Sequence, residues 1–131
     1  MKRWCWIFLF LAAIIHAQEL TFFTSLEQAQ QEAQREKKPL LIMFTQERCS
    51  ACEYMKERVF EDEMLSSYMH TQFVLLELDI NKQNIPMGLK VYGTPTFYVL
   101  NQNGQKVGRQ FVGGAQAPAF LNVLKQYKAQ L

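Results

Sequence analysis

The sequence has few cysteines and lacks a second CxxC pair. Three cysteines occur among 131 residues: Cys5 lies near the N-terminus, and Cys49 and Cys52 form a single CxxC pair. A structural zinc site needs four ligands, whereas the chain beyond its first 17 residues offers two cysteines and one histidine, His70. We therefore expect no metal, and we expect His70, at the end of a polar predicted helix, to face solvent.

The sequence also lacks a cluster of basic residues. It has 14 Lys and Arg against 12 Asp and Glu, for a formal net charge of +2. Lys2 and Arg3 account for this excess, because without them the basic count falls to 12 and equals the acidic count. No basic stripe remains that would indicate a nucleic-acid partner.

Residues 1–17 have the layout of a secretory signal peptide. "MKR" is followed by the apolar run "WCWIFLFLAAII", then by "HA" and the polar "QEL", which is the expected order of charge, apolar core and small residue. The run is shorter than the roughly 20 apolar residues of a membrane span. We predict cleavage near Ala17, with residues 18–131 as one domain. An uncleaved anchor is the alternative, and Cys5 stands too early in the run for a lipid-modified cysteine.

Strand-like and helix-like segments alternate along the rest of the chain, without a repeat or a linker. Apolar runs at 40–45 and 73–80 predict buried strands. Residues 94–101 and 108–114 predict two more strands, joined by a short turn as an antiparallel hairpin. The predicted helices lie at 24–38, 50–60 and 61–70, within 81–93, and from Pro118 onward. This order predicts an α/β fold, with a mixed central β-sheet flanked by helices on both faces.

The CxxC pair lies between a predicted buried strand and a predicted helix. A helix N-terminus carries unpaired N–H groups and a partial positive charge, which favour the thiolate, and the thiolate is the nucleophile in sulfur chemistry. Cys52 lies one helical turn after Cys49, near enough to attack a mixed disulfide formed there. A structural staple would more usually join distant segments. The pattern favours a redox couple over an inert staple, and an exported chain would meet conditions in which disulfides persist.

Three further stretches complete a resemblance to a known family. "FTQERCSACEYMK", "VYGTPTFYVLNQNG" and "FVGG" together resemble the thioredoxin superfamily over roughly residues 24–130. Within it, "CSACEYMKERVFEDEML" resembles exported thioredoxin-like proteins related to the C-terminal domain of DsbD-type thiol reductases. The resemblance implies a thioredoxin-like fold, thiol–disulfide oxidoreductase activity, and no cofactor beyond the redox-active disulfide. The implied partners are exported proteins with cysteines or disulfides, and a membrane thiol electron donor of the DsbD type.

The resemblance also implies roles for particular residues. Cys49 would be the attacking thiol and Cys52 the resolving thiol. Pro95 would be the family's cis-proline beside the disulfide, and Thr94 would offer its backbone to an extended substrate segment. Gly113 would lie near the same face, as the family's strand-end glycine does.

The chain departs from thioredoxin proper around the cysteines. Thioredoxin has Trp-Cys-Gly-Pro-Cys, whereas here Arg48 precedes the pair and Ser50-Ala51 fills it. The family's buried acid, six places before the first cysteine, aligns with Met43. Glu47 and Glu53 are the nearest carboxylates in sequence, so each is either a substitute base or simply solvated. They would oppose a thiolate, whereas Arg48 would favour it.

The sequence leaves the direction of electron flow open. No histidine lies between the cysteines to hydrogen-bond a thiolate, so we expect a periplasmic or otherwise exported reductant or isomerase rather than a strong oxidant. Two alternatives remain. The Met43 departure is compatible with a non-catalytic binding module on a thioredoxin scaffold. A specialised reductant of apocytochrome c cysteines would share the chemistry and differ only in its client.

Overall fold

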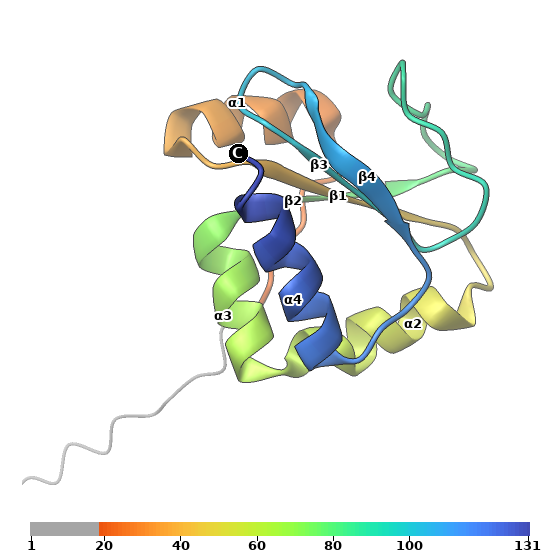
Figure 1. Cartoon of the computed structure of the whole chain (residues 1–131). Coiled ribbons are helices and arrows are strands. Elements are labelled where there is room, and N and C mark those ends of the chain that lie inside the picture. The colour runs from red at the N-terminus through yellow and green to blue at the C-terminus, as the bar shows by residue number, and fades with distance from the viewer. Residues whose placement is uncertain (1–18) are drawn as a thin grey trace, which may run out of the picture.

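The computed structural model describes residues 19–131, so the predicted signal segment and Cys5 lie outside the described residues. The helices are α1 (Leu26–Glu36), α2 (Ser50–Glu57), the short 3₁₀ helix η1 (Val59–Glu61), α3 (Glu63–Gln72) and α4 (Ala117–Lys128). The strands are β1 (Leu40–Thr45), β2 (Val74–Asp79), β3 (Thr96–Leu100) and β4 (Lys106–Val112). They form one sheet in the order β2-β1-β3-β4 (Figure 1).

The sheet is mixed, as predicted. β1 lies in its interior, parallel to β2 on one side and antiparallel to β3 on the other. β3 and β4 form the predicted antiparallel hairpin. All six residues of β1 are buried, because the strand has a neighbour on each side and helices above and below. Such a strand reads as one continuous apolar run rather than as an alternating pattern.

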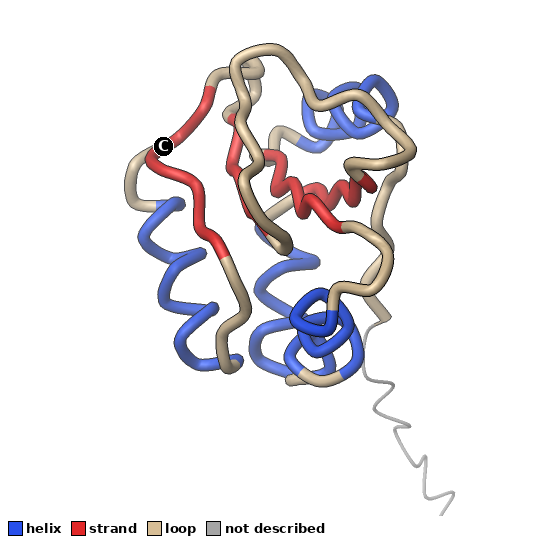
Figure 2. Tube along the Cα trace, turned by 90° about the vertical axis from the view of Figure 1, so that its right-hand side faces the viewer, coloured by secondary structure: helices blue, strands red, loops and turns tan. Residues whose placement is uncertain are grey.

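Side chains that alternate along β1 enter two separate cores. Met43 joins the core that contains both cysteines, under α2, α3 and α4. Ile42 joins the core on the opposite face, under α1. Helices α2, α3 and α4 lie on one side of the sheet, and α1 lies on the other (Figures 1 and 2). The α/β fold with both faces covered is therefore confirmed.

Side-chain caps start three of the helices. Ser25 accepts a hydrogen bond from the backbone N–H of Gln28 at the start of α1, and Asp62 accepts one from Leu65 at the start of α3. Cys49 occupies the same position before α2. Caps of this kind satisfy N–H groups that have no partner within the helix.

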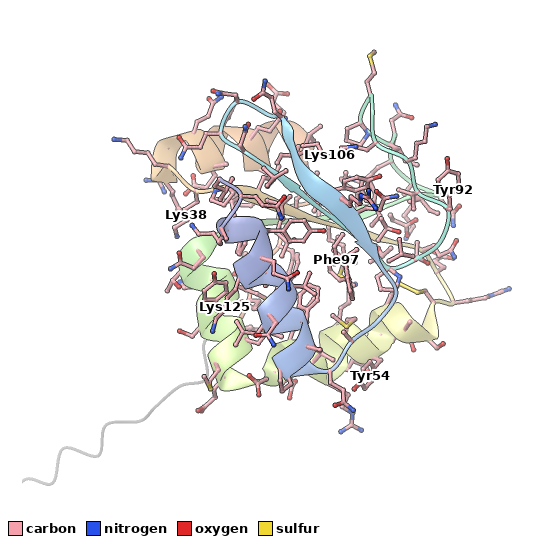
Figure 3. All side chains as sticks on the ribbon, in the orientation of Figure 1. Lys38, Tyr54, Tyr92, Phe97, Lys106 and Lys125 are labelled. Carbon is pink, nitrogen blue, oxygen red and sulfur yellow. A yellow bond between two sulfur atoms is a disulfide. The ribbon has the colours of Figure 1, made fainter. Side chains whose placement is uncertain are left out.

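Aromatic rings fill the core on the face that holds the cysteines. Phe120 of α4 lies 4.7 Å, centroid to centroid, from Phe97 of β3, and about 6 Å from Phe60 and Phe111. Figure 3 shows Phe97 between the sheet and the helices below it. Because these rings come from four elements, they join α4 and η1 to the sheet.

Several predicted boundaries are wrong, and one predicted helix is absent. Residues 80–95 form turns and extended chain rather than containing a helix. Pro86 lacks an N–H donor, Gly88 has a φ of +85°, and Tyr98 holds the backbone of Lys90 by both donating to its carbonyl and accepting from its N–H. These contacts replace helical hydrogen bonds. The helix predicted at 50–60 is also split, and β4 begins two residues earlier than expected.

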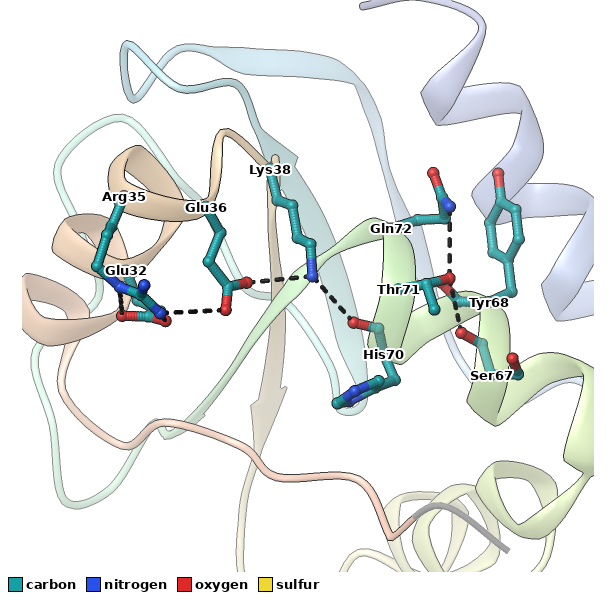
Figure 4. Close-up of polar contacts among 9 residues, drawn as sticks. All are labelled: Glu32, Arg35, Glu36, Lys38, Ser67, Tyr68, His70, Thr71 and Gln72. Carbon is teal, nitrogen blue, oxygen red and sulfur yellow. Dashed lines mark hydrogen bonds and ion pairs between the residues drawn. The ribbon is translucent and has the colours of Figure 1, made fainter. Parts of the chain in front are cut away.

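A polar network lies where α1 and α3 end, near the first residue of β1 (Figure 4). Arg35 pairs with Glu32, one helical turn earlier, and lies 3.4 Å from Glu36. Lys38 pairs with Glu36 over 3.1 Å and donates to the carbonyl of His70, at 3.3 Å. His70 is exposed, as predicted.

Within residues 19–131, no helix has the length and apolar character that crossing a membrane requires.

Candidate active site

The two cysteines form a disulfide at the start of α2 (Figure 3). The chain leaves the end of β1, makes a short turn and enters the helix at Ser50, so that Cys49 is the capping residue. The Sγ atom of Cys49 accepts a hydrogen bond from the backbone N–H of Cys52 over 3.1 Å. The same N–H donor would stabilise a thiolate on Cys49 in the reduced protein.

Both sulfur-bearing side chains are largely buried, but not equally. Cys49 is 8 % exposed and Cys52 is 4 % exposed. Burial alone disfavours a charged thiolate, so the helix N-terminus is the feature that counteracts it at Cys49. The more exposed cysteine is thus also the one that caps the helix, which agrees with the order of attack that the resemblance implies.

The turn before α2 carries two of the predicted modulators. Arg48 has a φ of +58°, in the left-handed region that non-glycine residues rarely adopt. Glu47 pairs with Lys82 over 3.2 Å, and its hydrogen bond raises the pKa of Lys82. With a side chain 71 % exposed, Glu47 is solvated and already paired. Glu53, the third modulator, is also exposed.

Pro95 and Gly113 lie side by side, just before the first residue of β3 and just after the last residue of β4. The peptide bond between Thr94 and Pro95 is cis, and Pro95 is buried. The N–H of Gly113 donates to the carbonyl of Pro95 over 2.8 Å. Gly113 has a φ of +94°, a conformation that glycine adopts without a steric penalty. This contact continues the β3–β4 ladder by one step beyond the hairpin strands.

The chain after Gly113 runs along the first turn of α2. A Cβ atom added to Gly114 would lie 3.9 Å from the Cβ of Ala51, which separates the two cysteines, and 3.8 Å from Tyr54. The N–H of Ala115 points to the Sδ atom of Met55 at 3.4 Å. The structure therefore brings the predicted proline and glycine, far from the CxxC in sequence, to the helix that carries it.

An open pocket of about 440 Å³ lies on the other side of the disulfide. Cys49 and Cys52 line it together with two residues that sequence reasoning missed, Lys56 and Glu77. Lys56 of α2 and Glu77 of β2 form an ion pair. One signal could have identified Glu77: it interrupts the apolar run "FVLLELDI" in its interior, whereas the other charge of that run, Asp79, lies near its end. Its partner could not be identified without the arrangement of α2 over β2.

Met43 does not face solvent or the open pocket. It is completely buried in the core that contains the cysteines, and no acid replaces it on β1. In the register of the sheet, Met43 lies directly opposite Glu77 of β2. Neighbouring strands lie about 4.8 Å apart, so the carboxylate of Glu77 stands one strand away from the position of the family's buried acid.

Among residues 19–131, no cluster of His, Cys, Asp and Glu could hold a metal ion.

A CxxC disulfide that caps a helix leaving the end of a central strand is the arrangement typical of a thioredoxin-like domain. The family comparison agrees. Residues 26–128 match the model of the thioredoxin-like domain family, and the chain belongs to that family.

Two named relatives place the chain more closely. It is 27 % identical over 101 residues to the thiol:disulfide interchange protein DsbD of Campylobacter jejuni, covering 73 % of this chain. The match spans only 18 % of that much longer protein. A thioredoxin from Thermus thermophilus has 25 % identity and a TM-score of 0.69, covering 83 % of this chain and 87 % of its own.

A third comparison concerns the fold alone. The C-terminal domain of Neisseria meningitidis DsbD, in its oxidised form, has a TM-score of 0.62 at 20 % identity. The similarity covers 82 % of this chain and 99 % of that one. The DsbD-like resemblance seen in the sequence is therefore confirmed at the level of the domain.

Proposed function

We propose that this chain reduces or isomerises disulfides in exported proteins by exchange at Cys49 and Cys52. The observation that carries the proposal is the disulfide itself, with Cys49 at a helix N-terminus and Cys52 one turn later. The cysteine pair takes up two electrons when its disulfide is reduced and releases them when the dithiol is oxidised, so the reaction uses no further cofactor.

The reducing reaction has two steps. The Cys49 thiolate attacks one sulfur of a client disulfide, and the other client sulfur leaves as a thiolate. Cys52, having lost its proton, then attacks the Sγ atom of Cys49. The bond between Cys49 and the client breaks, the client leaves as a second thiolate, and the Cys49–Cys52 disulfide forms. In the oxidising direction the same steps run in reverse.

Surroundings on the proline side of the disulfide favour a protein client. Thr94, Pro95 and Gly113 form the end of the β3–β4 hairpin, which continues along α2, and we assign the backbone of Thr94 to an extended client segment. Val112 and Tyr54, which flank this region, are 55 % and 44 % exposed. Exposed apolar side chains beside a reactive group suit contact with another polypeptide.

The compartment and the electron donor follow from two lines of support. The N-terminal 17 residues have the composition of a secretory signal, and the relatives named above include DsbD proteins. We propose an exported, periplasmic location and reduction by a membrane thiol donor of the DsbD type. An alkaline phosphatase fusion to residues 1–25 should be active only if the segment directs export.

Insulin reduction tests the catalytic proposal. The wild-type domain, residues 18–131, should accelerate reduction by dithiothreitol, and Cys49→Ser should abolish the acceleration. Cys52→Ser should instead accumulate mixed disulfides with its clients, which non-reducing gels and mass spectrometry would detect. Full retention of client binding by Cys49→Ser, with no thiol-dependent activity in the wild type, would instead identify a binding module.

The reduction potential tests the direction. No basic or histidine side chain lies between the cysteines, and Glu47 and Glu53 add negative charge nearby. We expect a potential well below that of a strong oxidant, which is about −120 mV. Equilibration with glutathione buffers measures it, and a value near −120 mV would reverse the assignment to an oxidase.

A further inference from the structure

Glu77 is a charged side chain in the middle of an apolar strand. Two positions before it, Leu75 belongs to the core that contains Cys49 and Cys52. Because side chains alternate along a strand, Glu77 points to the same face as Leu75. That face lies under α2, and the Glu77 carboxylate lines the same open pocket as both cysteines.

Two side chains fix the carboxylate of Glu77. The Oγ1 atom of Thr45 donates a hydrogen bond to Glu77 Oε1 over 3.1 Å, and the ammonium of Lys56 forms an ion pair with the same oxygen. The backbone is fixed as well, because the N–H of Glu77 donates to the carbonyl of Phe23 over 2.9 Å. Both side-chain contacts are to Oε1, so the lone pairs of Oε2 are available to accept a proton.

Lys56 connects Glu77 to the second cysteine. It lies four residues after Cys52 on α2, and residues four apart share one face of a helix. The ion pair therefore places the carboxylate beneath the helix face that carries Cys52. Cys49, which caps the helix one turn earlier, is correspondingly farther along the helix from Lys56.

Charged groups of both signs border the pocket. Glu47 and Arg48 come from the turn before α2, and Glu53 comes from α2 itself. Asp79 ends β2, and Lys82 lies in the loop after it. A neighbouring hollow that Glu77 also lines adds Glu19 and Glu61. Of these acids, Glu47 and Asp79 each form an ion pair with Lys82, and Glu53 is exposed. Glu77, with 24 % of its side chain exposed, is the acid that an ion pair joins to α2 itself.

We propose that Glu77 accepts the proton of Cys52 when Cys52 resolves the mixed disulfide, with Lys56 and Thr45 as positioning residues. The inference rests on the proposed function, since it needs a mixed disulfide on Cys49. The pocket is open and far larger than the roughly 30 Å³ of one water molecule, so water carries the proton between the two groups.

The step balances without a further reactant. The Cys52 thiol passes its proton through water to Glu77, and the resulting thiolate attacks the Sγ atom of Cys49. A bond forms between the two cysteine sulfurs, and the bond between Cys49 and the client sulfur breaks. The client leaves with that electron pair as a thiolate and takes up the proton that Glu77 returns through water.

A single-turnover reaction with one equivalent of 5,5′-dithiobis(2-nitrobenzoate) separates the two steps. Attack by Cys49 releases one coloured thionitrobenzoate, and resolution by Cys52 releases the second. At pH 7, Glu77→Gln should slow the second release about tenfold and leave the first unchanged. General base catalysis is worth 10²- to 10⁴-fold, and the intervening water places the expected effect below that range. The difference should disappear at alkaline pH, where solution hydroxide removes the proton.

Matched variants distinguish a proton acceptor from a merely structural residue. Glu77→Gln keeps the shape and can still accept from Thr45. Glu61→Gln removes an acid that lines the neighbouring hollow together with Glu77 but does not line the pocket of the cysteines, and it should alter neither phase. Glu77→Asp keeps a carboxylate and should recover part of the lost rate. If Glu77→Gln does not fold, a selective slowing of the second phase in Glu77→Asp carries the test.

Each remaining outcome has a defined meaning. A second phase with the same pH profile in wild type and Glu77→Gln would overturn the inference. So would a faster second phase in the variant, because a carboxylate that only repels the Cys52 thiolate would act in that way. Absence of a first phase in the wild type would overturn the proposed function, and this inference with it.

Discussion

The two ends of β1 carry polar groups for different reasons. At the Leu40 end, where α1 and α3 finish, the charges of Glu32, Arg35 and Glu36 pair with neighbours a few residues away (Figure 4). At the Thr45 end, Glu77 pairs with a lysine that is 21 positions away and on another element. At the Leu40 end the ion pairs are local, and the long-range contact is the hydrogen bond from Lys38 to the carbonyl of His70. At the Thr45 end the ion pair itself joins two separate elements beside a disulfide.

The difference in burial between the two ends of β1 indicates which end is expected to be a reactive site. Exposed ion pairs contribute little to stability, because water already solvates both partners. A half-buried carboxylate loses part of its hydration and is retained only with hydrogen bonds and a counter-charge. Glu77 has both, and it lies in a pocket with two reactive sulfurs, which is typical of a functional site rather than of a solvated surface.

The largest expected effect contrasts the two ends in activity. Cys49→Ser should lower insulin reduction to the uncatalysed rate, because the attacking sulfur is absent. Lys38→Met, which removes the lysine contacts to Glu36 and His70 at the opposite end, should leave the activity within the error of the assay. A large loss of activity in Lys38→Met would show that the two ends are coupled.

A substitution in the core should lower the stability of the whole domain, and so affect both ends of β1 together. Phe120→Ala would leave a cavity among the rings of Phe60, Phe97 and Phe111, and truncating a buried phenylalanine costs about 3–5 kcal/mol. Urea denaturation should show this loss of unfolding free energy. Leu121→Ala, on the same helix but only partly buried, is the control and should lose less. Equal losses would mean that the ring cluster adds nothing to the stability.

A smaller effect is expected at Tyr127, whose hydroxyl donates to the carbonyl of Arg109. Tyr127→Phe should lower the unfolding free energy by about 1 kcal/mol, the usual contribution of one hydrogen bond. Burial, with a lesser contribution from Tyr98, raises the pKa of Tyr127. The folded state therefore favours the neutral phenol, and the stabilisation is complete below pH 10 and declines as pH rises through the higher folded pKa.

The pH dependence gives this prediction its control. The unfolding free energies of wild type and Tyr127→Phe should differ most near neutral pH and approach each other above about pH 10, the ordinary pKa of tyrosine. Phenylalanine cannot ionise, so only the wild type should show the alkaline loss at this position. A difference that grows with alkaline pH would contradict the sign of the shift.

The smallest effect is expected in the polar network itself. Arg35→Gln removes the pairing with Glu32 and Glu36, and the thermal midpoint should not change measurably. The hydrogen bond to Glu32 raises the pKa of Arg35, and Arg35 in turn lowers the pKa of Glu32. Arg35 is exposed and Glu32 partly so, so salt should remove any residual difference. A midpoint shift as large as that of Tyr127→Phe would place this network among the stabilising contacts.

Local sequence patterns predicted the order of the strands along the chain and the redox pair, although one predicted helix is absent. Residues 40–44 are all apolar and Thr45 ends the run, and the strand found there has the predicted limits, because a strand covered on both faces is mostly apolar on both. Cys49 was expected at a helix start, and it is there. The helix expected within 81–93 failed because Tyr98, outside that segment, binds its backbone, and no local pattern records such a contact.

The residues that come together near the disulfide from distant parts of the chain could be found only from the fold. The hydrogen bond between Gly113 and Pro95, the passage of Gly114 along α2 and the pairing of Glu77 with Lys56 all join separate elements. Local sequence patterns reflect hydrophobic periodicity and capping, which act over a few residues. The register of β1 against β2 and the packing of α2 over them are set by the whole core, and they determine which carboxylate faces the cysteines.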